Sequence, residues 1–194
     1  MTRRVDFDRA GRGIEEFLRG MGHDPDHDPD LAGVGQRVAE AWATDLLAGE
    51  AIDVGVVLRE GSTPARGCEQ AVVAIRNLST VTVCPHHLLP AVGTATVLYI
   101  PGERIAGLGA IARVVDGSAR RLVLQEDIGE RVAKALVEHL GARGALCRLS
   151  MMHTCLVARG ERKHDAVVET LALAGSLAAP GPDRELALAE LGVG

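Results

Sequence analysis

The chain changes character at Val81-Thr82-Val83-Cys84-Pro85-His86-His87-Leu88-Leu89-Pro90. The β-favouring residues that begin this stretch predict the end of a strand, and the closing proline predicts the exit of a turn. Cys84 and His87 form a Cys-x-x-His pair, whose thiolate and imidazole suit zinc, and a turn of this length lets both reach one ion. His86 lies between them and need not be a ligand. The stretch therefore predicts a strand end that carries a metal-binding turn.

The composition suits one globular domain with a helical extension and argues against a nucleic-acid partner. The 194 residues are 47% hydrophobic and 24% charged, which is ordinary for a globular protein. Aromatic residues make up only 2%, so the chain lacks the aromatic faces on which single-stranded nucleic acid stacks. The net charge of -5 gives no electrostatic attraction for a polyanionic backbone. We therefore expect no nucleic-acid partner.

Membrane insertion and secretion are not expected either. No window approaches the roughly 20 apolar residues of a membrane span, and the first residues carry two arginines without an apolar stretch behind them. We expect a cytoplasmic protein with no membrane partner, in which the four cysteines are thiols or metal ligands rather than disulfides. Cys68 and Cys147 are interpreted as small buried hydrophobic residues.

The N-terminal part is predicted to be mostly helical. Apolar residues recur at helical spacing over residues 7–20 and again over 31–47. Between them, residues 23–30 read His-Asp-Pro-Asp-His-Asp-Pro-Asp, which could suggest a metal site. We interpret them as a solvated connector, because prolines keep the backbone extended and aspartates form turns without a metal. The signal over 54–66 is weak, and a loop is predicted at 61–64.

The remainder predicts an α+β fold. Six elements are expected in the order strand, strand, helix, helix, strand, strand, at residues 70–83, 92–100, 107–122, 126–140, 145–158 and 166–174. The first two strands flank a short connection, so they should pair antiparallel, with the helices on one face of a four-stranded antiparallel sheet. Three regions follow: a helical region at 1–66, the sheet domain at 67–176, and a C-terminal tail at 177–194 with a short helical pattern and no assigned role.

A third metal ligand is expected on the third strand. His153 and Cys155 are two residues apart, and side chains at that spacing in a strand point to the same face. With Cys84 and His87, Cys155 would give three protein ligands and an open fourth position, which is typical of catalytic zinc. His86 and His153 would then be unligated imidazoles suited to proton transfer near neutral pH. On spacing alone, the alternative is that these residues bind no metal.

Several motifs together resemble the GTP cyclohydrolase I family, in the same order and with closely matching separations. They are Cys84-Pro85-His86-His87-Leu88-Leu89-Pro90, Tyr99-Ile100-Pro101, Gly107-Leu108-Gly109-Ala110-Ile111-Ala112-Arg113-Val114-Val115, Gln125-Glu126 and His153-Thr154-Cys155-Leu156-Val157-Ala158-Arg159-Gly160. The resemblance runs from about Arg37 to Leu173. It implies the tunnelling fold, in which sheets from several subunits close into a barrel and pentamers stack into a homodecamer. It also implies zinc, with Cys84, His87 and Cys155 at the ligand positions.

The resemblance also implies roles at the base end of a substrate site. His86 and His153 match two histidines that transfer protons. Gln125 and Glu126 match the pair at the guanine, where a carboxylate can accept hydrogen bonds from the ring N–H and the exocyclic amine. The alternative for this pair is a helix N-terminal cap, because the apolar stripe begins just after it.

At the phosphate end, Arg113 and Arg159 match phosphate-contacting arginines, and Arg37 resembles the one that a neighbouring subunit contributes. The implied substrate is a guanine nucleotide, with GTP first. Zinc would activate a water molecule that attacks C8 of the guanine, the imidazole ring would open with release of formate, and the ribose would rearrange and close into a dihydropterin.

Three positions depart from the family pattern. Pro85 replaces the usual glutamate, Ala110 replaces the usual lysine, and Glu40 stands where some members are basic. The last two change the charge where a triphosphate should lie, and one lost cation can cost about 1.5–3 kcal/mol of charge-assisted hydrogen bonding. They motivate a second hypothesis, a divergent paralogue that uses a less phosphorylated guanine compound.

Two other functions remain open. One is a non-catalytic tunnelling-fold protein that keeps zinc and a purine or pterin pocket. Such a binder has no need of the unligated His86 and His153. The other is a reductase with a cysteine nucleophile, which the Cys-x-x-His pair disfavours because metal ligation would consume the thiolate.

Overall fold

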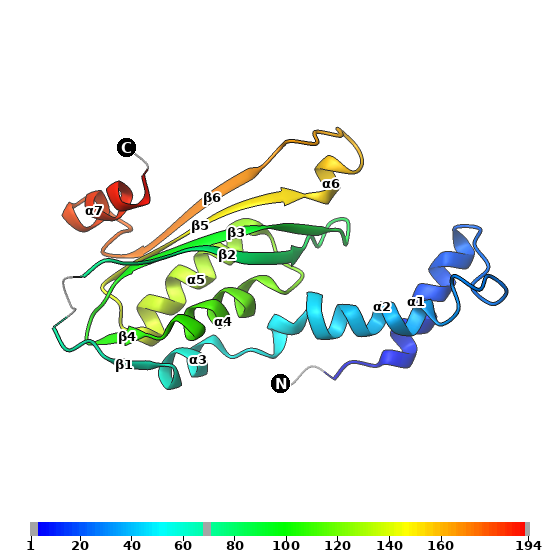
Figure 1. The fold of residues 1–194 in the computed structure, drawn as a ribbon, viewed down its shortest axis with the longest axis horizontal. Coiled ribbons are helices and arrows are strands. Elements are labelled where there is room, and N and C mark those ends of the chain that lie inside the picture. Colours follow the sequence, from blue (N-terminus) through cyan, green and yellow to red (C-terminus); the bar gives the residue numbers. More distant parts are fainter. Residues whose placement is uncertain (1–3, 68–70, 193–194) are drawn as a thin grey trace.

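A four-stranded antiparallel sheet forms the body of the protein in the computed structural model, which describes residues 4–67 and 71–192. Its strands are β2 (Val73–Val83), β3 (Pro90–Ile100), β5 (Gly144–His153) and β6 (Val168–Gly175), in the spatial order β2-β3-β5-β6. Helices α4 (Leu108–Ala119) and α5 (Gln125–Leu140) lie against one face of this sheet (Figure 1). The prediction of an α+β fold with an antiparallel sheet is confirmed.

The core lies between the sheet and these two helices. Because strand side chains alternate between faces, every second residue of β5 points at the helices, and four such residues are fully buried: Ala145, Cys147, Leu149 and Met151. Burial raises the pKa of the Cys147 thiol to about 12, so it stays protonated. The interpretation of Cys147 as a small buried hydrophobic residue is confirmed, whereas Cys68 lies outside the described residues.

Strand β2 is irregular in the middle. Its pairing with β3 shifts between Ile75 and Leu78, and Asn77 there has a positive φ of 58°. Asparagine tolerates this left-handed conformation better than most residues, so the sequence permits a bulge at this point. The bulge interrupts an outer strand of the sheet.

Residues 54–66 contain more regular structure than their sequence indicates. Asp53 caps the start of helix α3 (Val54–Glu60), because its carboxylate accepts a 3.0 Å hydrogen bond from the Val56 N–H. The loop predicted at 61–64 is wrong at β1 (Ser62–Pro64), which pairs antiparallel with β4 (Arg104–Ala106). The guanidinium of Arg104 also donates to the Ser62 hydroxyl at 2.8 Å. Partners some forty residues away in the chain therefore impose this strand.

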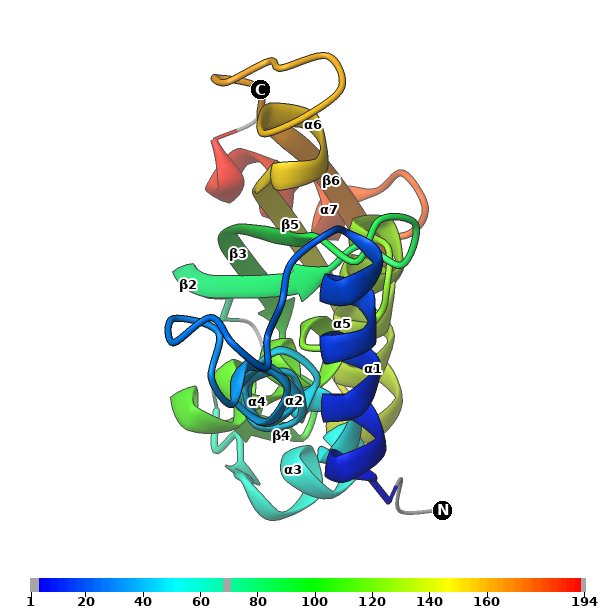
Figure 2. The same cartoon turned by 90° about the vertical axis from the view of Figure 1, so that its right-hand side faces the viewer.

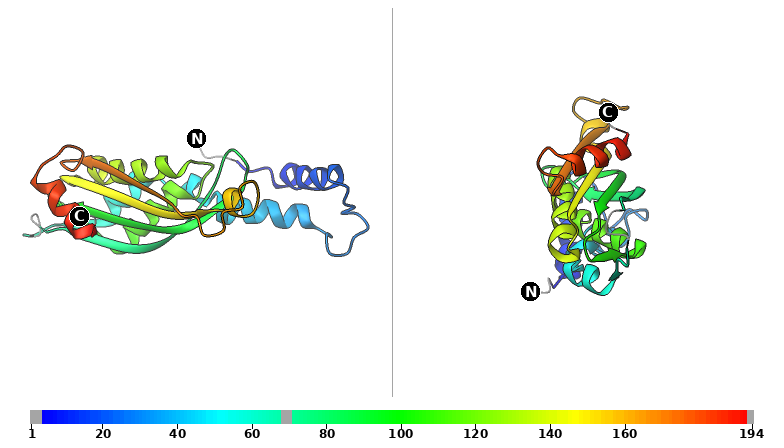
Figure 3. Two further views of the ribbon diagram at one scale, coloured as in Figure 1. Left: turned by 90° about the horizontal axis from the view of Figure 1, so that it is seen from above. Right: turned by 90° about the vertical axis from the view of Figure 1, so that its left-hand side faces the viewer.

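The N-terminal helices form an arm that projects beyond one end of the sheet (Figures 1 and 3). The arm consists of α1 (Phe7–Gly20) and α2 (Val34–Ala41), and α2 continues into a π-helical turn, η1 (Trp42–Leu46), and a 3₁₀ turn, η2 (Ala48–Ala51). The helix predicted at 31–47 is therefore shorter and changes its winding. The two helices touch closely, because a Cβ on Gly35 would lie 2.5 Å from the Gly11 carbonyl oxygen.

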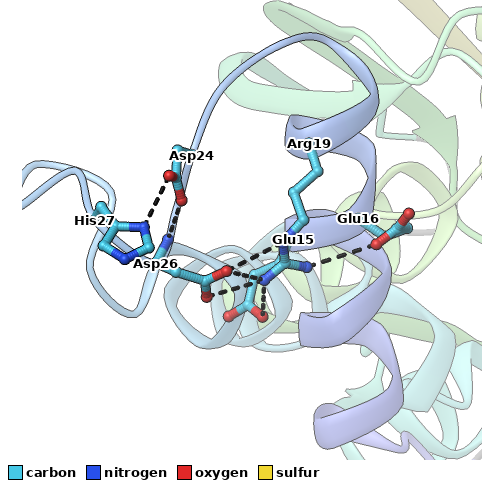
Figure 4. Close-up of polar contacts among 6 residues, drawn as sticks. All are labelled: Glu15, Glu16, Arg19, Asp24, Asp26 and His27. Atoms are coloured by element: carbon cyan, nitrogen blue, oxygen red, sulfur yellow. Dashed lines mark hydrogen bonds and ion pairs between the residues drawn. The ribbon is translucent and has the colours of Figure 1, made fainter.

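A cluster of exposed charged groups holds the connector of the arm to α1 (Figure 4). Arg19 pairs with Asp26 at 3.0 Å and also lies near two glutamates of α1, Glu15 and Glu16. Asp24 contacts Nδ1 of His27 at 2.8 Å, and this hydrogen bond lowers the pKa of the Asp24 carboxyl. The aspartates and His27 thus pair with near neighbours in the chain, as a solvated connector requires.

The tail packs on the face of the sheet that α4 and α5 leave open. Helix α7 (Pro182–Leu191) and the turn before it bury Leu177 and Ala187 against Leu98 and Ile100, which alternate with the helix-facing residues of β3. The Arg76 guanidinium of β2 donates to the Glu190 carbonyl at 2.6 Å. The tail is therefore an ordered part of the fold. None of the described helices combines the length and the apolar character that crossing a membrane requires.

Candidate metal centre and active site

Three strand ends bring the candidate residues together at one end of the sheet. Val83 pairs with Pro90, and Ala91 pairs with His153, so β2 ends, β3 begins and β5 ends side by side. Figures 1 and 2 show the β2–β3 turn at the same end as the segment that follows β5. Antiparallel pairing therefore places the turn at 84–89 close to Cys155.

The β2–β3 turn is closed by its own backbone. The Cys84 N–H donates to the Leu89 carbonyl and the Leu88 N–H donates to the Cys84 carbonyl, each at 2.9 Å. Leu88 has a positive φ of 54°, an uncommon conformation for a branched residue. His86 and His87 project from this turn, both exposed, with ring centroids 6.4 Å apart and ring planes 85° apart.

The prediction that His153 and Cys155 share one strand face is wrong. β5 ends at His153, and Cys155 lies in the short helix α6 (Thr154–Val157). The Thr154 hydroxyl donates a 2.6 Å hydrogen bond to the Pro90 carbonyl, which holds this helical turn against the start of β3. A contact between distant segments thus overrides the β-favouring sequence and still delivers Cys155 to the turn.

The three predicted metal ligands form one cluster. The ligand atoms of Cys84, His87 and Cys155 all lie within 4.8 Å of one another. A tetrahedral zinc ion at its usual bond lengths holds such donors about 3.5–3.8 Å apart, so small side-chain rotations are enough to close the site. Two sulfurs and one imidazole are a soft donor set of the kind that zinc prefers. The residues present therefore fit a zinc ion.

The electrostatics of the two thiols also favour a cation. Burial raises the pKa of Cys155, the neighbouring Cys84 raises it further, and the charge of Arg159 acts in the opposite direction. Cys84 thus disfavours the thiolate form of Cys155. A divalent cation between them reverses this effect, because it stabilises both thiolates.

The connection between α4 and α5 is attached to the end of β2. The Val83 N–H donates to the Arg121 carbonyl at 3.2 Å, and the Val83 carbonyl accepts from the Val123 N–H at 3.4 Å. The Thr82 hydroxyl, which is buried, also lies within hydrogen-bond distance of both carbonyls, Arg121 and Val123. These contacts fix the start of α5 beside the β2–β3 turn.

Gln125 and Glu126 begin α5 and face different surroundings. Gln125 is 2% exposed, and its Oε1 lies 2.7 Å from Nε2 of His153. Glu126 is exposed and lines a cavity of about 560 Å³ between α5 and β6, together with Glu130 and Lys134. The N-cap of α5 is Leu124, without a side-chain hydrogen bond, so neither residue acts as the predicted alternative cap.

His153 is partly buried at this junction. Burial lowers its pKa, while the nearby Glu126 carboxylate acts to raise it. Its ring is held by Gln125 on one side, and His153 is the last residue of β5, two residues before Cys155. An imidazole in this position is suited to proton transfer near the cluster.

The predicted phosphate-contacting arginines lie farther apart in the fold than the three candidate metal ligands. Arg159 follows α6 and lies close enough to Cys155 to act on its pKa. Arg113 is exposed on α4, and Arg37 is exposed on α2, within the arm, where its guanidinium donates to the Ala32 carbonyl. The phosphate roles of these three residues remain predictions.

The departures from the family pattern lie in different surroundings. Pro85 is exposed in the turn. Ala110 is buried at 8% exposure. Its Cβ lies close to Gly61, where an added Cβ would be 2.7 Å from the Ala110 Cβ. Glu40 is exposed on α2 and accepts a hydrogen bond from Gln36 at 2.8 Å. The side chain at position 110 therefore points into the protein.

The sequence reasoning missed two residues that shape the site, Thr82 and Thr154. Both act through hydroxyl contacts with backbone carbonyls far along the chain. Their only sequence signal is adjacency to the motifs, since Thr154 immediately precedes Cys155.

Comparison with known proteins agrees with this geometry. The family model for GTP cyclohydrolase I matches residues 10–191. GTP cyclohydrolase 1 of Leifsonia xyli subsp. xyli is 40% identical over 190 residues, which is 97% of each chain. GTP cyclohydrolase 1 of Mycobacterium ulcerans is 37% identical over 189 residues, covering 96% of this chain and 91% of the relative.

The solved structure of the archaeosine synthase QueF-Like in the apo form is also similar, with a TM-score of 0.46 and 16% identity. It covers 57% of this chain and 97% of that one. This likeness is too low to bear on function. The match to the family model spans nearly the whole chain, including Cys84, His87 and Cys155. The chain belongs to the GTP cyclohydrolase I family.

Proposed function

We propose that the chain is a zinc-dependent cyclohydrolase that opens the imidazole ring of a guanine nucleotide, GTP, releases formate and forms 7,8-dihydroneopterin triphosphate. The observation that carries this proposal is the group of Cys84, His87 and Cys155 beside two further imidazoles, His86 and His153. A pure binding protein has no need of unligated histidines next to an open metal position. Family membership supports the same reaction.

The residues divide the chemistry between them. Cys84, His87 and Cys155 would hold zinc, which when bound lowers the pKa of a water ligand and so supplies a nucleophile near neutral pH. His153 and His86 would exchange protons with the purine as water adds at C8 and the C8–N9 bond breaks. Formate leaves when the remaining C8–N7 bond is hydrolysed.

The substrate would lie with its base at α5 and its phosphates among the arginines. The exposed carboxylate of Glu126 can accept hydrogen bonds from the N1–H and the exocyclic amine of guanine. Arg159 and Arg113 would contact the phosphates, and Arg37 would reach the site of a neighbouring subunit. The amine freed at N7 would then condense with the carbonyl of the rearranged ribose, with loss of water, and this ring closure gives the dihydropterin.

Sharing of Arg37 requires an oligomer, and we infer the tunnelling-fold barrel built from pentamers that stack into a decamer. The projecting arm supports this inference, since a segment outside the body can reach another subunit (Figure 3). The outer strands β2 and β6 support it too, because a strand at the edge of a sheet can pair with another chain.

Incubation of the zinc-loaded protein with GTP, with formate and pterin absorbance followed together, tests the reaction. We expect both products in equal amounts. Formate without a pterin would restrict the activity to ring opening. Absence of both, with zinc bound, would contradict the enzyme and favour a zinc-retaining protein that binds a purine or pterin.

Two structural observations favour a second candidate substrate, a less phosphorylated guanine compound. Ala110 is buried against Gly61 and brings no cation to the phosphate end, and Glu40 adds an acidic group to the arm. Turnover of GTP, GDP, GMP and guanosine by the same preparation separates the two candidates. A clear preference for GTP with ordinary affinity would exclude the second one.

A further inference from the structure

We propose that Gln125 is a positioning residue, whose side chain holds His153 as the tautomer with hydrogen on Nε2 and leaves Nδ1 as the proton-exchanging atom. The inference rests on the proposed function, because it assigns the working atom of a histidine in that reaction. It also gives Gln125 a role different from contacting the guanine through its side chain.

The surrounding backbone fixes the orientation of the Gln125 amide. Its Nε2 donates to the Val168 carbonyl at 2.9 Å and to the Leu149 carbonyl at 3.4 Å, and it lies 3.2 Å from the Thr170 hydroxyl. Carbonyl oxygens only accept hydrogen bonds, so the amide nitrogen must face them. The opposite orientation would set the Gln125 oxygen against two carbonyl oxygens.

The fixed amide in turn fixes the histidine. Gln125 Oε1 is left facing Nε2 of His153 at 2.7 Å, and an amide oxygen can only accept. Nε2 of His153 must therefore carry the hydrogen. A neutral imidazole with hydrogen on Nε2 has its lone pair on Nδ1, so Nδ1 is the atom that can take a proton and later return it.

Because Gln125 is buried, its side chain cannot readily exchange these hydrogen-bond partners for others. The side chain is 2% exposed, so water cannot replace a partner that it loses. All its hydrogen-bonding groups are engaged by β5, β6 and His153. Contact between its amide and a base would leave a buried carbonyl or the His153 N–H without a partner.

Steady-state kinetics separate a positioning residue from a base-contacting one. We expect Gln125→Leu to lower kcat by about 10- to 100-fold, the range typical of partners that orient a histidine, with little change in KM. The matched control is Glu126→Gln, at the neighbouring exposed residue, which should raise KM instead. A Gln125→Leu enzyme with raised KM and normal kcat would overturn the inference.

A double-mutant cycle shows whether Gln125 acts through His153. In a His153→Ala background, Gln125→Leu should cost little further kcat, because the residue that it orients is gone. An equally large fall in kcat on Gln125→Leu substitution, with His153 present and with His153→Ala, would overturn the inference. Thermal unfolding and zinc content are measured for each variant.

A measurement on the unmodified protein covers the case in which the Gln125 variants do not fold. Nitrogen-15 NMR of the zinc-loaded protein, labelled at histidine and assigned by the signal lost in His153→Ala, reports which ring nitrogen carries the hydrogen. At a pH where the ring is neutral, we expect a protonated Nε2 and an unprotonated Nδ1. The opposite tautomer would overturn the inference even in an active enzyme. The expected tautomer in a protein that turns over no guanine nucleotide would support the role of Gln125 and overturn the proposed function.

Discussion

The end of the sheet that carries the candidate metal ligands and the N-terminal arm use polar side chains in opposite ways. At the sheet end, Cys84 and Gln125 are buried and their partners come from elements far apart in the sequence. In the arm, Arg19, Asp24 and Asp26 are exposed and pair with residues a few positions away (Figure 4). Polar groups in the body are therefore positioned by the whole fold, whereas those of the arm position only their own loop.

Removal of a metal ligand should have the largest effect of any change to either region. We expect Cys84→Ala and Cys155→Ala to lose bound zinc and more than about 100-fold of turnover, because even the outer partners of metal ligands typically cost 10- to 100-fold. Metal analysis and formate release measure both. Cys147→Ala is the matched control: this buried cysteine belongs to the core, so zinc should remain while the melting temperature falls. Full zinc content in Cys84→Ala would refute the assigned cluster.

The arm is expected to matter for catalysis through another subunit. Arg37→Ala and His153→Ala proteins should each be nearly inactive. Co-expression should restore about one quarter of the sites, because random mixing pairs an intact metal centre with an intact Arg37 at that frequency. Co-expression of His153→Ala with Cys84→Ala is the control and should restore no activity, since both changes damage the same part of the site, at the same end of the sheet. No recovery in the first mixture would mean that Arg37 does not serve a neighbouring site.

A smaller effect is expected where the fold supports a ligand indirectly. Thr154→Val removes the hydroxyl that bonds to the Pro90 carbonyl at 2.6 Å. The loss of one such hydrogen bond is worth about 1 kcal/mol, so zinc affinity should fall by about fivefold. Competition with a chelator measures the change, and Thr154→Ser, which keeps the hydroxyl, should bind zinc normally. An unchanged affinity in Thr154→Val would show that α6 is held by other contacts.

The smallest effect is expected in the exposed cluster of the arm. The hydrogen bond to His27 lowers the pKa of the Asp24 carboxyl. The carboxylate therefore stabilises the arm fully at a pH above 3.8, the ordinary pKa of this group. That contribution is lost as the pH falls through the lower folded value. Asp24→Asn should leave turnover unchanged and lower the melting temperature slightly at pH 6. The difference from the unmodified protein should disappear at strongly acidic pH. A difference that grows on acidification would contradict this account.

Local patterns in the sequence predicted the parts of the site that lie within one turn. The Cys84 and His87 pair needs only a strand end and a short connection, both of which show in the residue types. Helix α5 was equally clear, because its apolar residues recur at helical spacing and Gly141 ends it with a positive φ of 74°.

Contacts between distant segments decided the rest. Cys155 sits in a helical turn because Thr154 bonds to Pro90, sixty-four residues earlier. The partners of Gln125 come from β5 and β6, so its sequence position beside Glu126 gave no sign of its burial. Residues with clear local patterns were therefore placed correctly, while those with long-range hydrogen bonds needed the fold.

The outer edge of β2 carries one further consequence. Both backbone polar groups of Val83 are already bonded to the connection before α5, and the bulge between Ile75 and Leu78 interrupts the strand at its other end. A strand that adds to this edge can therefore form a regular ladder only over the short run between the two interruptions. This limits the alignments open to an incoming chain and protects the edge from indiscriminate aggregation, while leaving room for one specific partner.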